Sequence, residues 1–347
     1  MIQDAIRTDP IAVPEHRRAA ILALMAALGD AKRVALSTHM NSDGDGCGSE
    51  AALAMLLAQR GVQVHIVNPT PWPVMFQWLL TEGVTDRTHD GTKALAGIDR
   101  LIVLDISDVK RLGALTETVR SLTPAPLTID HHLPSDEPPG TVFVTDTTAC
   151  ATGELIWDVA TVLDLTITPA IATALYTALL TDTGGFRFSN TSPRCLAIAS
   201  RLLAAGVNPE EMYRRIYASV PKGRLGLLRD ALGTLGTDES LGLAWVSVAA
   251  GALEAYNVTG EDLDGIAEYP RSIDGVRLAL LFRDLGHGKV KISFRSVGMV
   301  DANALARQFG GGGHAKASGA LVSGTLAEVQ ERVIAAAREA LAGRERG

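Results

Sequence analysis

Aromatic residues, cysteine and long apolar runs are all scarce in this chain of 347 residues. Aromatic residues make up 5% of the sequence, and its three cysteines are Cys47, Cys150 and Cys195. Three widely spaced cysteines do not suit a disulfide framework, which favours a reducing environment. No apolar run reaches the roughly 18 residues of a membrane-spanning helix, and residues 1–18 lack the apolar core and cleavage site of a signal peptide. We therefore predict a cytoplasmic protein with no membrane partner.

Positive charge is also in short supply. The chain has 32 Lys and Arg residues against 39 Asp and Glu residues, a formal net charge of -7. Proteins that follow long nucleic acids usually present a basic face, because neutralising phosphates drives that binding. We therefore expect no long duplex partner, and any anionic substrate should be small and bound locally.

The first half of the chain alternates short apolar strands with helices. The length of the whole chain and its hydrophobic content of 47% suit two domains with full cores. The pattern predicts strands at 33–37, 63–67, 101–104 and 126–129, and helices at 15–29, 48–60, 148–163 and 169–180. Such alternation is typical of an α/β fold in which helices cover both faces of a parallel sheet.

The second half has a different texture. Helices are predicted near 193–204 and 209–218, strands at 241–248, 276–283 and 289–294, and helices at 302–309 and from a Thr325–Glu328 capping box to about 342. Residues 219–240 are the best boundary candidate. We predict a catalytic, metal-binding domain at 1–190, a helical linker at 191–240 and a smaller α/β domain at 241–347.

The first strand is followed by a loop that carries His39, Asp43 and Asp45 among glycines. Open α/β sheets bind ligands outside the carboxyl ends of their strands. Carboxylates and imidazole suit divalent ions, and glycine lets the backbone fold closely around them. The alternative is a turn in which the aspartates only cap the next helix.

Three further elements carry acidic or imidazole side chains. Asp105 ends the apolar strand LIVL, and Asp130, His131 and His132 follow the strand PLTI. Asp182 lies at the end of an apolar helix, where a negative charge opposes the helix dipole and calls for a cation. Taken alone, Asp105 could be an ordinary aspartate that begins a loop. Taken alone, His131 and His132 could be a histidine pair on the surface.

Convergence favours a metal site over these alternatives. Three of the four elements lie at strand ends of one expected parallel sheet, where their side chains meet. Together they offer enough carboxylates and imidazoles for two divalent ions that share one bridging carboxylate. Asp105, alone on its strand, is the natural bridge.

The segments STHMNSDGDGCGS, LIVLD, IDHH and TDTGGF resemble, in this order, the four motifs of the DHH phosphoesterase superfamily. FRS at 294–296 and GGGGHAKASGA at 310–320 resemble the signature of the DHHA1 domain. In length and architecture the chain is most similar to the group of nano-RNases and pAp phosphatases. The resemblance implies a parallel-sheet DHH domain, a smaller DHHA1 domain and an active site in the cleft between them.

The resemblance also implies residue roles. Two Mn²⁺ ions per chain, or other divalent ions such as Mg²⁺ or Co²⁺, would be held by His39, Asp43, Asp45, Asp105, His131 and Asp182. The catalytic residues would be Asp105, Asp130, His131 and His132. The substrate would be bound by His132, Arg295, Gly311, Gly312, Gly313 and His314. The first motif departs from the family in having Ser42 where a proline is frequent, and in Cys47; neither is an expected ligand.

The expected activity is Mn²⁺-dependent hydrolysis of short oligonucleotides, linear dinucleotides or 3′-phosphoadenosine 5′-phosphate (pAp). Four aspartates and two divalent ions would leave the metal centre near neutrality, so substrate charge needs separate partners, such as the planar fork of Arg295. The alternatives are an inorganic pyrophosphatase, a RecJ-type exonuclease and a non-catalytic nucleotide sensor. The family suggests a homodimer, which no apolar stripe in this sequence proves.

Overall fold

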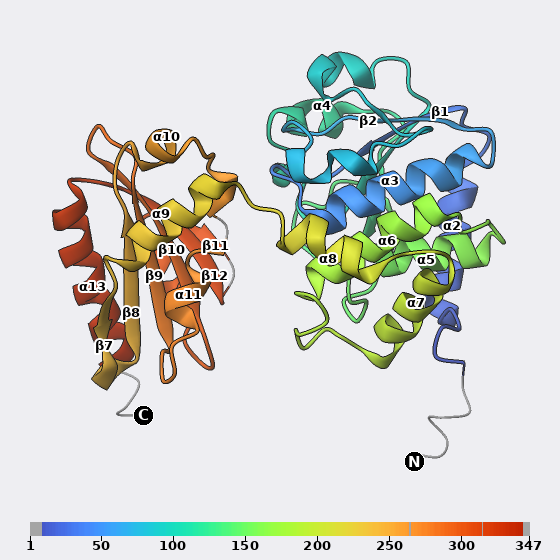
Figure 1. The fold of residues 1–347 in the computed structure, drawn as a ribbon. Helices are drawn as coiled ribbons and strands as arrows, with labels where there is room; N and C mark the ends of the chain where they lie inside the picture. The colour runs from blue at the N-terminus through green and yellow to red at the C-terminus, as the bar shows by residue number, and fades with distance from the viewer. Residues whose placement is uncertain (1–8, 264, 314, 343–347) are drawn as a thin grey trace. The chain divides into compact units, whose positions relative to one another are not determined.

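A computed structural model describes residues 9–263, 265–313 and 315–342 of the chain. The chain divides into two compact units, with the boundary between Ala218 and Ser219 (Figure 1). This boundary lies inside the segment predicted as a linker. Within the described ranges, no helix is long and apolar enough to cross a membrane.

The first unit is built on a six-stranded sheet in which every pair of neighbouring strands is parallel. Its order is β3-β2-β1-β4-β5-β6. The strands are β1 (Arg33–Ser37), β2 (Gln63–Ile66), β3 (Thr85–Asp86), β4 (Arg100–Leu104), β5 (Leu127–Asp130) and β6 (Val142–Thr145). From β1 the chain continues to β2 and β3 on one side of the sheet, and from β4 it continues to β5 and β6 on the other side. The neighbours β1 and β4 therefore form the switch point, where open α/β sheets bind their ligands.

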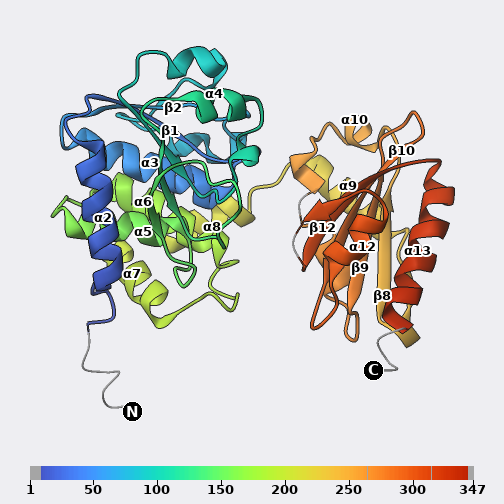
Figure 2. The same cartoon turned by 180° about the vertical axis from the view of Figure 1, so that it is seen from behind.

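Helices cover both faces of this sheet, as predicted (Figures 1 and 2). The larger core lies on one face and includes residues of α2 (Glu15–Leu28), α3 (Gly44–Ala58), α5 (Thr152–Val162), α6 (Pro169–Asp182), α7 (Pro193–Ala204) and α8 (Pro209–Tyr217). A smaller core on the other face includes residues of η2 (Thr88–Leu95), η3 (Val109–Leu115) and α4 (Thr116–Ser121). A further turn, η1 (Val74–Leu79), packs against the larger core.

The second unit contains a mixed six-stranded sheet of order β11-β12-β10-β9-β8-β7. Its strands are β7 (Gly236–Asp238), β8 (Leu243–Val248), β9 (Leu278–Asp284), β10 (Lys289–Ser296), β11 (Gly312–Gly313) and β12 (Ala317–Ser323). Only β8 and β9 pair in parallel within the described sheet. The helices are α9 (Lys222–Leu232), η4 (Glu239–Leu241), α10 (Ala252–Tyr256), η5 (Glu261–Leu263), α11 (Glu268–Arg271), α12 (Ala302–Gln308) and α13 (Leu326–Ala342). The Thr325–Glu328 capping box precedes α13 as predicted, since each residue's backbone N–H donates to the other's side chain.

Three helix boundaries differ from the sequence-based expectation and bear on the site; one of them is the start of α5, at Thr152 rather than residue 148. Helix α3 begins at Gly44 rather than near residue 48, because the Asp43 carboxylate accepts hydrogen bonds from the N–H groups of Asp45 and Gly46. Helix α6 continues to Asp182, two residues beyond its predicted end. The expected loop is therefore partly helical, and its aspartates lie at a helix N-terminus.

Candidate metal centre

His39 and Asp43 meet at the start of α3. The Nδ1 atom of His39 is 2.9 Å from the carbonyl oxygen of Met40, which directs Nε2 toward the carboxylates. That Nε2 atom lies 3.8 Å from Asp43 Oδ2 and 3.5 Å from Asp105 Oδ2. Asp43 uses its other oxygen, Oδ1, to cap the helix. Metal binding and helix capping, posed as alternatives from the sequence, are thus compatible for this residue.

Asp105 lies at the switch point and presents its two oxygens to two different groups of side chains. It is buried, and its backbone is left-handed, with φ of 61°. Its Oδ2 faces His39, whereas Oδ1 lies 3.6 Å from Nε2 of His131 and accepts a hydrogen bond from Thr152 Oγ1. This geometry suits the bridging role expected for it.

The second group of side chains comprises Asp45, His131 and Asp182. The Nε2 atom of His131 is 3.6 Å from Asp45 Oδ2 and 3.7 Å from Asp182 Oδ2. Asp45 is held by the backbone N–H groups of Thr152 and Gly153, at 2.6 and 2.9 Å. These two amides belong to the first turn of α5, so a helix N-terminus fixes the carboxylate by hydrogen bonds and by its dipole.

His132 contacts Asp130, and its ligand atoms also lie close to those of Asp105 and His131. Its Nδ1 lies 2.7 Å from Asp130 Oδ1, and 3.6 Å from Asp105 Oδ1. A carboxylate on Nδ1 orients the ring and leaves Nε2 for another partner. Burial lowers the pKa of His132, but the Asp130 hydrogen bond and the Asp105 charge outweigh burial and raise it.

The electrostatics of the cluster call for positive charge. Burial raises the pKa of Asp45 well above its usual range, and the charges of Asp105 and Asp182 raise it further. Burial also raises the pKa of Asp182, to about 6. Burial lowers the pKa of His39, but the carboxylates of Asp105 and Asp43 outweigh burial and raise it to about 10. Protons on these groups thus supply charge that a bound cation could replace.

The side chains present fit divalent metal ions. Two groups with mutually close ligand atoms, His39–Asp43–Asp105 and Asp45–His131–Asp182, together contain all six predicted ligands. The Nε2 atom of His131 is buried and has no hydrogen-bond partner in the described part of the chain, although three carboxylates surround it. Ligand atoms about 2.1 Å from one ion lie ~3–3.5 Å apart, close to the separations described above. The structure thus brings together all six predicted ligands.

Several residues that support the centre were not predicted from the sequence. Ser49 and Thr152 donate hydroxyl hydrogen bonds to Asp45 and Asp105, and Asn190 donates its amide to Asp182. The spacing of Ser49 from Asp45, one helical turn, is a signal available in the sequence. Thr152 and Asn190 carry no such signal, because their contacts depend on how separate segments pack.

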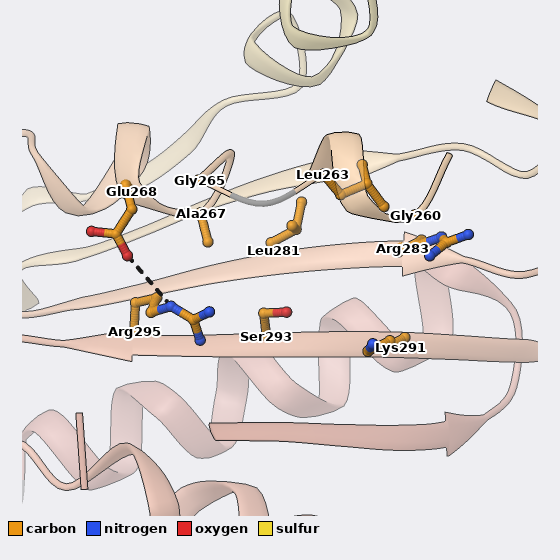
Figure 3. A pocket seen from close by; sticks show the side chains of 10 residues that line it. All are labelled: Gly260, Leu263, Gly265, Ala267, Glu268, Leu281, Arg283, Lys291, Ser293 and Arg295. Atoms are coloured by element: carbon orange, nitrogen blue, oxygen red, sulfur yellow. Dashed lines mark ion pairs between the residues drawn. The ribbon is translucent and has the colours of Figure 1, made fainter. Parts of the chain in front are cut away.

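In the second unit, Arg295 lies on β10 and lines a pocket (Figure 3). Lys291 and Ser293 precede it on the same face of the strand, and Arg283 pairs with Lys291 from β9. The Nε atom of Arg295 lies 3.4 Å from Glu268 Oε1, an ion pair that Figure 3 marks with a dashed line. The predicted substrate residue is therefore in a mainly basic environment.

The glycine run is structured rather than a linker. Gly312 and Gly313 form β11 and pair with Gly319 and Ser318 of β12. A Cβ atom on Gly311 would lie 2.1 Å from the carbonyl oxygen of Gly319, so no other residue fits there. The N–H of Gly311 donates to Ala306 O and is not free for an anion. His314, predicted to bind substrate, lies outside the described residues.

Fold and cluster together define an α/β protein with a histidine–aspartate centre at the switch point of a parallel sheet, followed by a second α/β unit. The model of the DHH family, N-terminal domain, matches residues 33–179, and that of the DHHA1 domain matches residues 246–343. A Thermus thermophilus relative is 32% identical over 310 residues, covering 88% of this chain and 89% of its own length. The chain belongs to the DHH family.

That relative is named bifunctional oligoribonuclease and PAP phosphatase NrnA. A protein of the same name from Bacillus subtilis is 27% identical over 297 residues, 83% of this chain and 89% of that protein. The crystal structure of an exopolyphosphatase-related protein from Bacteroides fragilis has a TM-score of 0.84 at 26% identity, covering 94% of this chain and 96% of its own. An exonuclease RecJ bound to manganese shares the fold, with a TM-score of 0.52 at 18% identity, covering 96% of both chains.

Proposed function

We propose that this protein is a two-metal phosphoesterase that hydrolyses short oligonucleotides and pAp. One observation carries the proposal: six histidine and aspartate side chains converge at the switch point, with Asp105 facing both groups. The names of the NrnA relatives support the substrate class. A cytoplasmic location and a homodimeric state stay predictions from the sequence.

The geometry supports the ligand roles that the family resemblance implies. His39, Asp43 and Asp105 would hold one divalent ion, and Asp45, Asp105, His131 and Asp182 the other, with Mn²⁺ as the expected metal. Such a pair of ions activates water and stabilises the charge that develops on a phosphoryl group. The amides of Thr152 and Gly153 keep Asp45 in place, so that its ligand atoms are pre-organised.

His132 is the proposed proton donor. Asp130 accepts from Nδ1 and leaves Nε2 for the substrate, and its hydrogen bond favours the protonated ring by raising the pKa of His132. This proton can pass to the sugar oxygen that leaves when the phosphorus–oxygen bond breaks. Asp130 is then a positioning residue for His132.

Arg295 is the proposed partner of the substrate's remaining phosphate. Its guanidinium carries two parallel N–H donors that match phosphate oxygens. Glu268, exposed to solvent in part, occupies Arg295 in this structure through a single weak contact, which a phosphate can replace. Binding by the amides of Gly312 and Gly313 stays a prediction.

The test is a side-by-side assay with Mn²⁺ on a ribodinucleotide, pAp and pyrophosphate. We expect release of mononucleotides from the first and of AMP and phosphate from the second, with pyrophosphate a poor substrate. Preferential hydrolysis of pyrophosphate would establish a pyrophosphatase instead. Binding of nucleotides without turnover of any substrate would establish a sensor.

Arg295→Ala separates substrate binding from metal binding in the same assay. The KM for the dinucleotide and pAp should rise about tenfold or more, as for the loss of a charge-assisted bidentate contact. Metal content should stay at two ions per chain, because every proposed ligand lies in the first unit. Arg307→Ala, on α12, is the matched control and should behave like the unmodified protein.

A further inference from the structure

A second cavity lies in the first unit, beside His132. It has a volume of about 300 Å³ and is lined mainly by apolar surface, at the lower end of the range for small-molecule pockets. Asp130 and His132 belong to its wall, so it borders the candidate metal centre.

One wall is the sheet itself. Thr128 and Asp130 of β5 pair with Phe143 and Thr145 of β6, so the four side chains share one face. The alternate residues Ile129 and Val144 point to the opposite face and belong to the larger core. Phe143 keeps 37% of its surface exposed, an apolar surface that the described residues leave uncovered.

The loop between β5 and β6 supplies the facing wall, through Pro134, Pro138 and Pro139. This loop is anchored along its length. Ser135 Oγ donates to the carbonyl oxygen of Ser107 at 2.9 Å, and Val109 N–H donates to Glu137 O at 2.9 Å.

Two further contacts hold the loop in place. The Glu137 carboxylate also pairs with Lys110 and Arg120. A Cβ atom on Gly140 would lie 2.3 Å from Pro126 O, so only glycine lets the loop pass this close to β5. The cavity is therefore a pre-formed feature rather than a gap under a loose segment.

The residues that line the cavity indicate which kind of ligand it can bind. Among the described residues, no Lys or Arg lines the cavity and Asp130 does, which disfavours a phosphate. Phenyl and proline rings favour a flat, uncharged ring. Thr128 lines the cavity, and its Oγ1 atom is buried without a hydrogen-bond partner among the described residues. A hydroxyl can donate to or accept from the polar edge of such a ring.

We propose that this cavity receives a nucleobase of the substrate whose phosphate lies at the metal centre. The inference rests on the proposed function, since it names the nucleoside that would lie next to His132. A single hydroxyl both donates and accepts, so all four bases should be accommodated. Purines should bind more tightly than pyrimidines, because they cover more of Phe143 and the prolines.

The test uses adenosine, a neutral probe that needs no turnover, with binding to the full-length protein measured by calorimetry. Phe143→Ala should weaken adenosine binding about tenfold or more, as for loss of a base–aromatic contact. Thr128→Val, which keeps the shape and removes only the hydroxyl, should weaken it severalfold. Leu196→Ala, on the exposed side of α7, is the matched control and should not change it.

An activity measurement on the same variants separates this inference from the proposed function. The KM for a dinucleotide should rise with Phe143→Ala, whereas the KM for glycerol 3-phosphate, an ester without any ring, should not change. Equal effects on both substrates, or adenosine binding that ignores Phe143 and Thr128, would overturn the inference while leaving the phosphoesterase intact. Adenosine binding that depends on both residues, without hydrolysis of any ester, would sustain the cavity and reject the enzyme.

Discussion

Asp43 and Asp105 each divide their two carboxylate oxygens between different tasks. Asp43 caps α3 with one oxygen and faces His39 with the other. Asp105 faces His39 with Oδ2 and His131 with Oδ1. An amide side chain keeps the shape but has only one oxygen and no negative charge, so Asp→Asn is the sharpest substitution at these positions.

Asp105→Asn should therefore remove both metal ions and lower activity by more than about 100-fold, since losing even an indirect support of a metal ligand can cost that much. Metal content after gel filtration, measured by elemental mass spectrometry, is the readout. Asp182→Asn should retain the ion at His39 and Asp43, because Asp182 belongs only to the other ligand group, with Asp45 and His131. One tightly held ion in Asp105→Asn would contradict the bridging role.

Glu50 gives the first unit a pH dependence of its own. It is fully buried on α3, Asn68 donates to its Oε2, and its Oε1 has no partner among the described residues. Burial raises its pKa from 4.5 to about 8, despite the Asn68 hydrogen bond. Below pH 4.5 the group is protonated in both states. As the pH rises from 4.5 through 8, the unfolded chain ionises more readily, so the native state loses stability.

Glu50→Gln should remove this loss. Relative to the unmodified protein, the variant should gain on the order of 4 kcal/mol in unfolding free energy between pH 5 and pH 9. Urea unfolding in the presence of a chelator at both pH values measures the change. Glu210→Gln, on the exposed start of α8, should show no such gain. Parallel pH curves for Glu50→Gln and the unmodified protein would show that Glu50 ionises in the native state without cost.

At the scale of the elements, strand ends could be predicted far better than the contacts between segments. The apolar runs before His39, Asp105 and His131 identified three neighbouring strands, and parallel pairing then forces their ends together. The sequence did not predict β6, a short edge strand. It also did not predict that the start of α5 holds Asp45, because that contact depends on how α5 packs against α3.

The position of α5 depends in turn on a buried ionic network. Arg17 of α2 donates to Glu154 and Asp158 of α5, at 2.7 and 2.9 Å, and also pairs with Asp146. Arg194 of α7 pairs with the same two α5 carboxylates. Buried ion pairs thus join three helices. Removing one charged side chain leaves the opposite charges buried without compensation.

Arg17→Met should lower the free energy of unfolding by about 3–5 kcal/mol, because it leaves a single arginine to compensate three carboxylates. Metal affinity should fall as well, since α5 carries the amides that hold Asp45. Thermal unfolding and metal titration measure the two effects. Arg18→Met, on the same helix, should change neither by more than about 0.5 kcal/mol. A metal affinity of Arg17→Met equal to that of the unmodified protein would show that the network does not support the metal centre.

At the scale of the whole molecule, each unit has its own hydrophobic cores. Among the described residues, two cores lie in the first unit, on opposite faces of the parallel sheet, and two in the second. All six proposed metal ligands lie in the first unit. A bound ion stabilises only the unit that binds it, by an amount set by the ratio of its concentration to its Kd.

Calorimetric scans with Mn²⁺ and with chelator should therefore differ in one transition. The unfolding of the first unit should move upward by about 2.7 kcal/mol for an ion at 100 times its Kd. The transition of the second unit should not move, and Arg295→Ala should leave both scans unchanged. An equal shift of both transitions would show that the units unfold as one.

The left-handed backbone of Asp105 has a further consequence. Side chains other than glycine reach this conformation at a cost of about 1 kcal/mol, so the molecule gives up stability at the residue its chemistry needs most. Asp105→Gly should accordingly be more stable than Asp105→Ala by about 1 kcal/mol in chelator, although both lack activity. Selection for stability and selection for activity would then favour different residues at position 105.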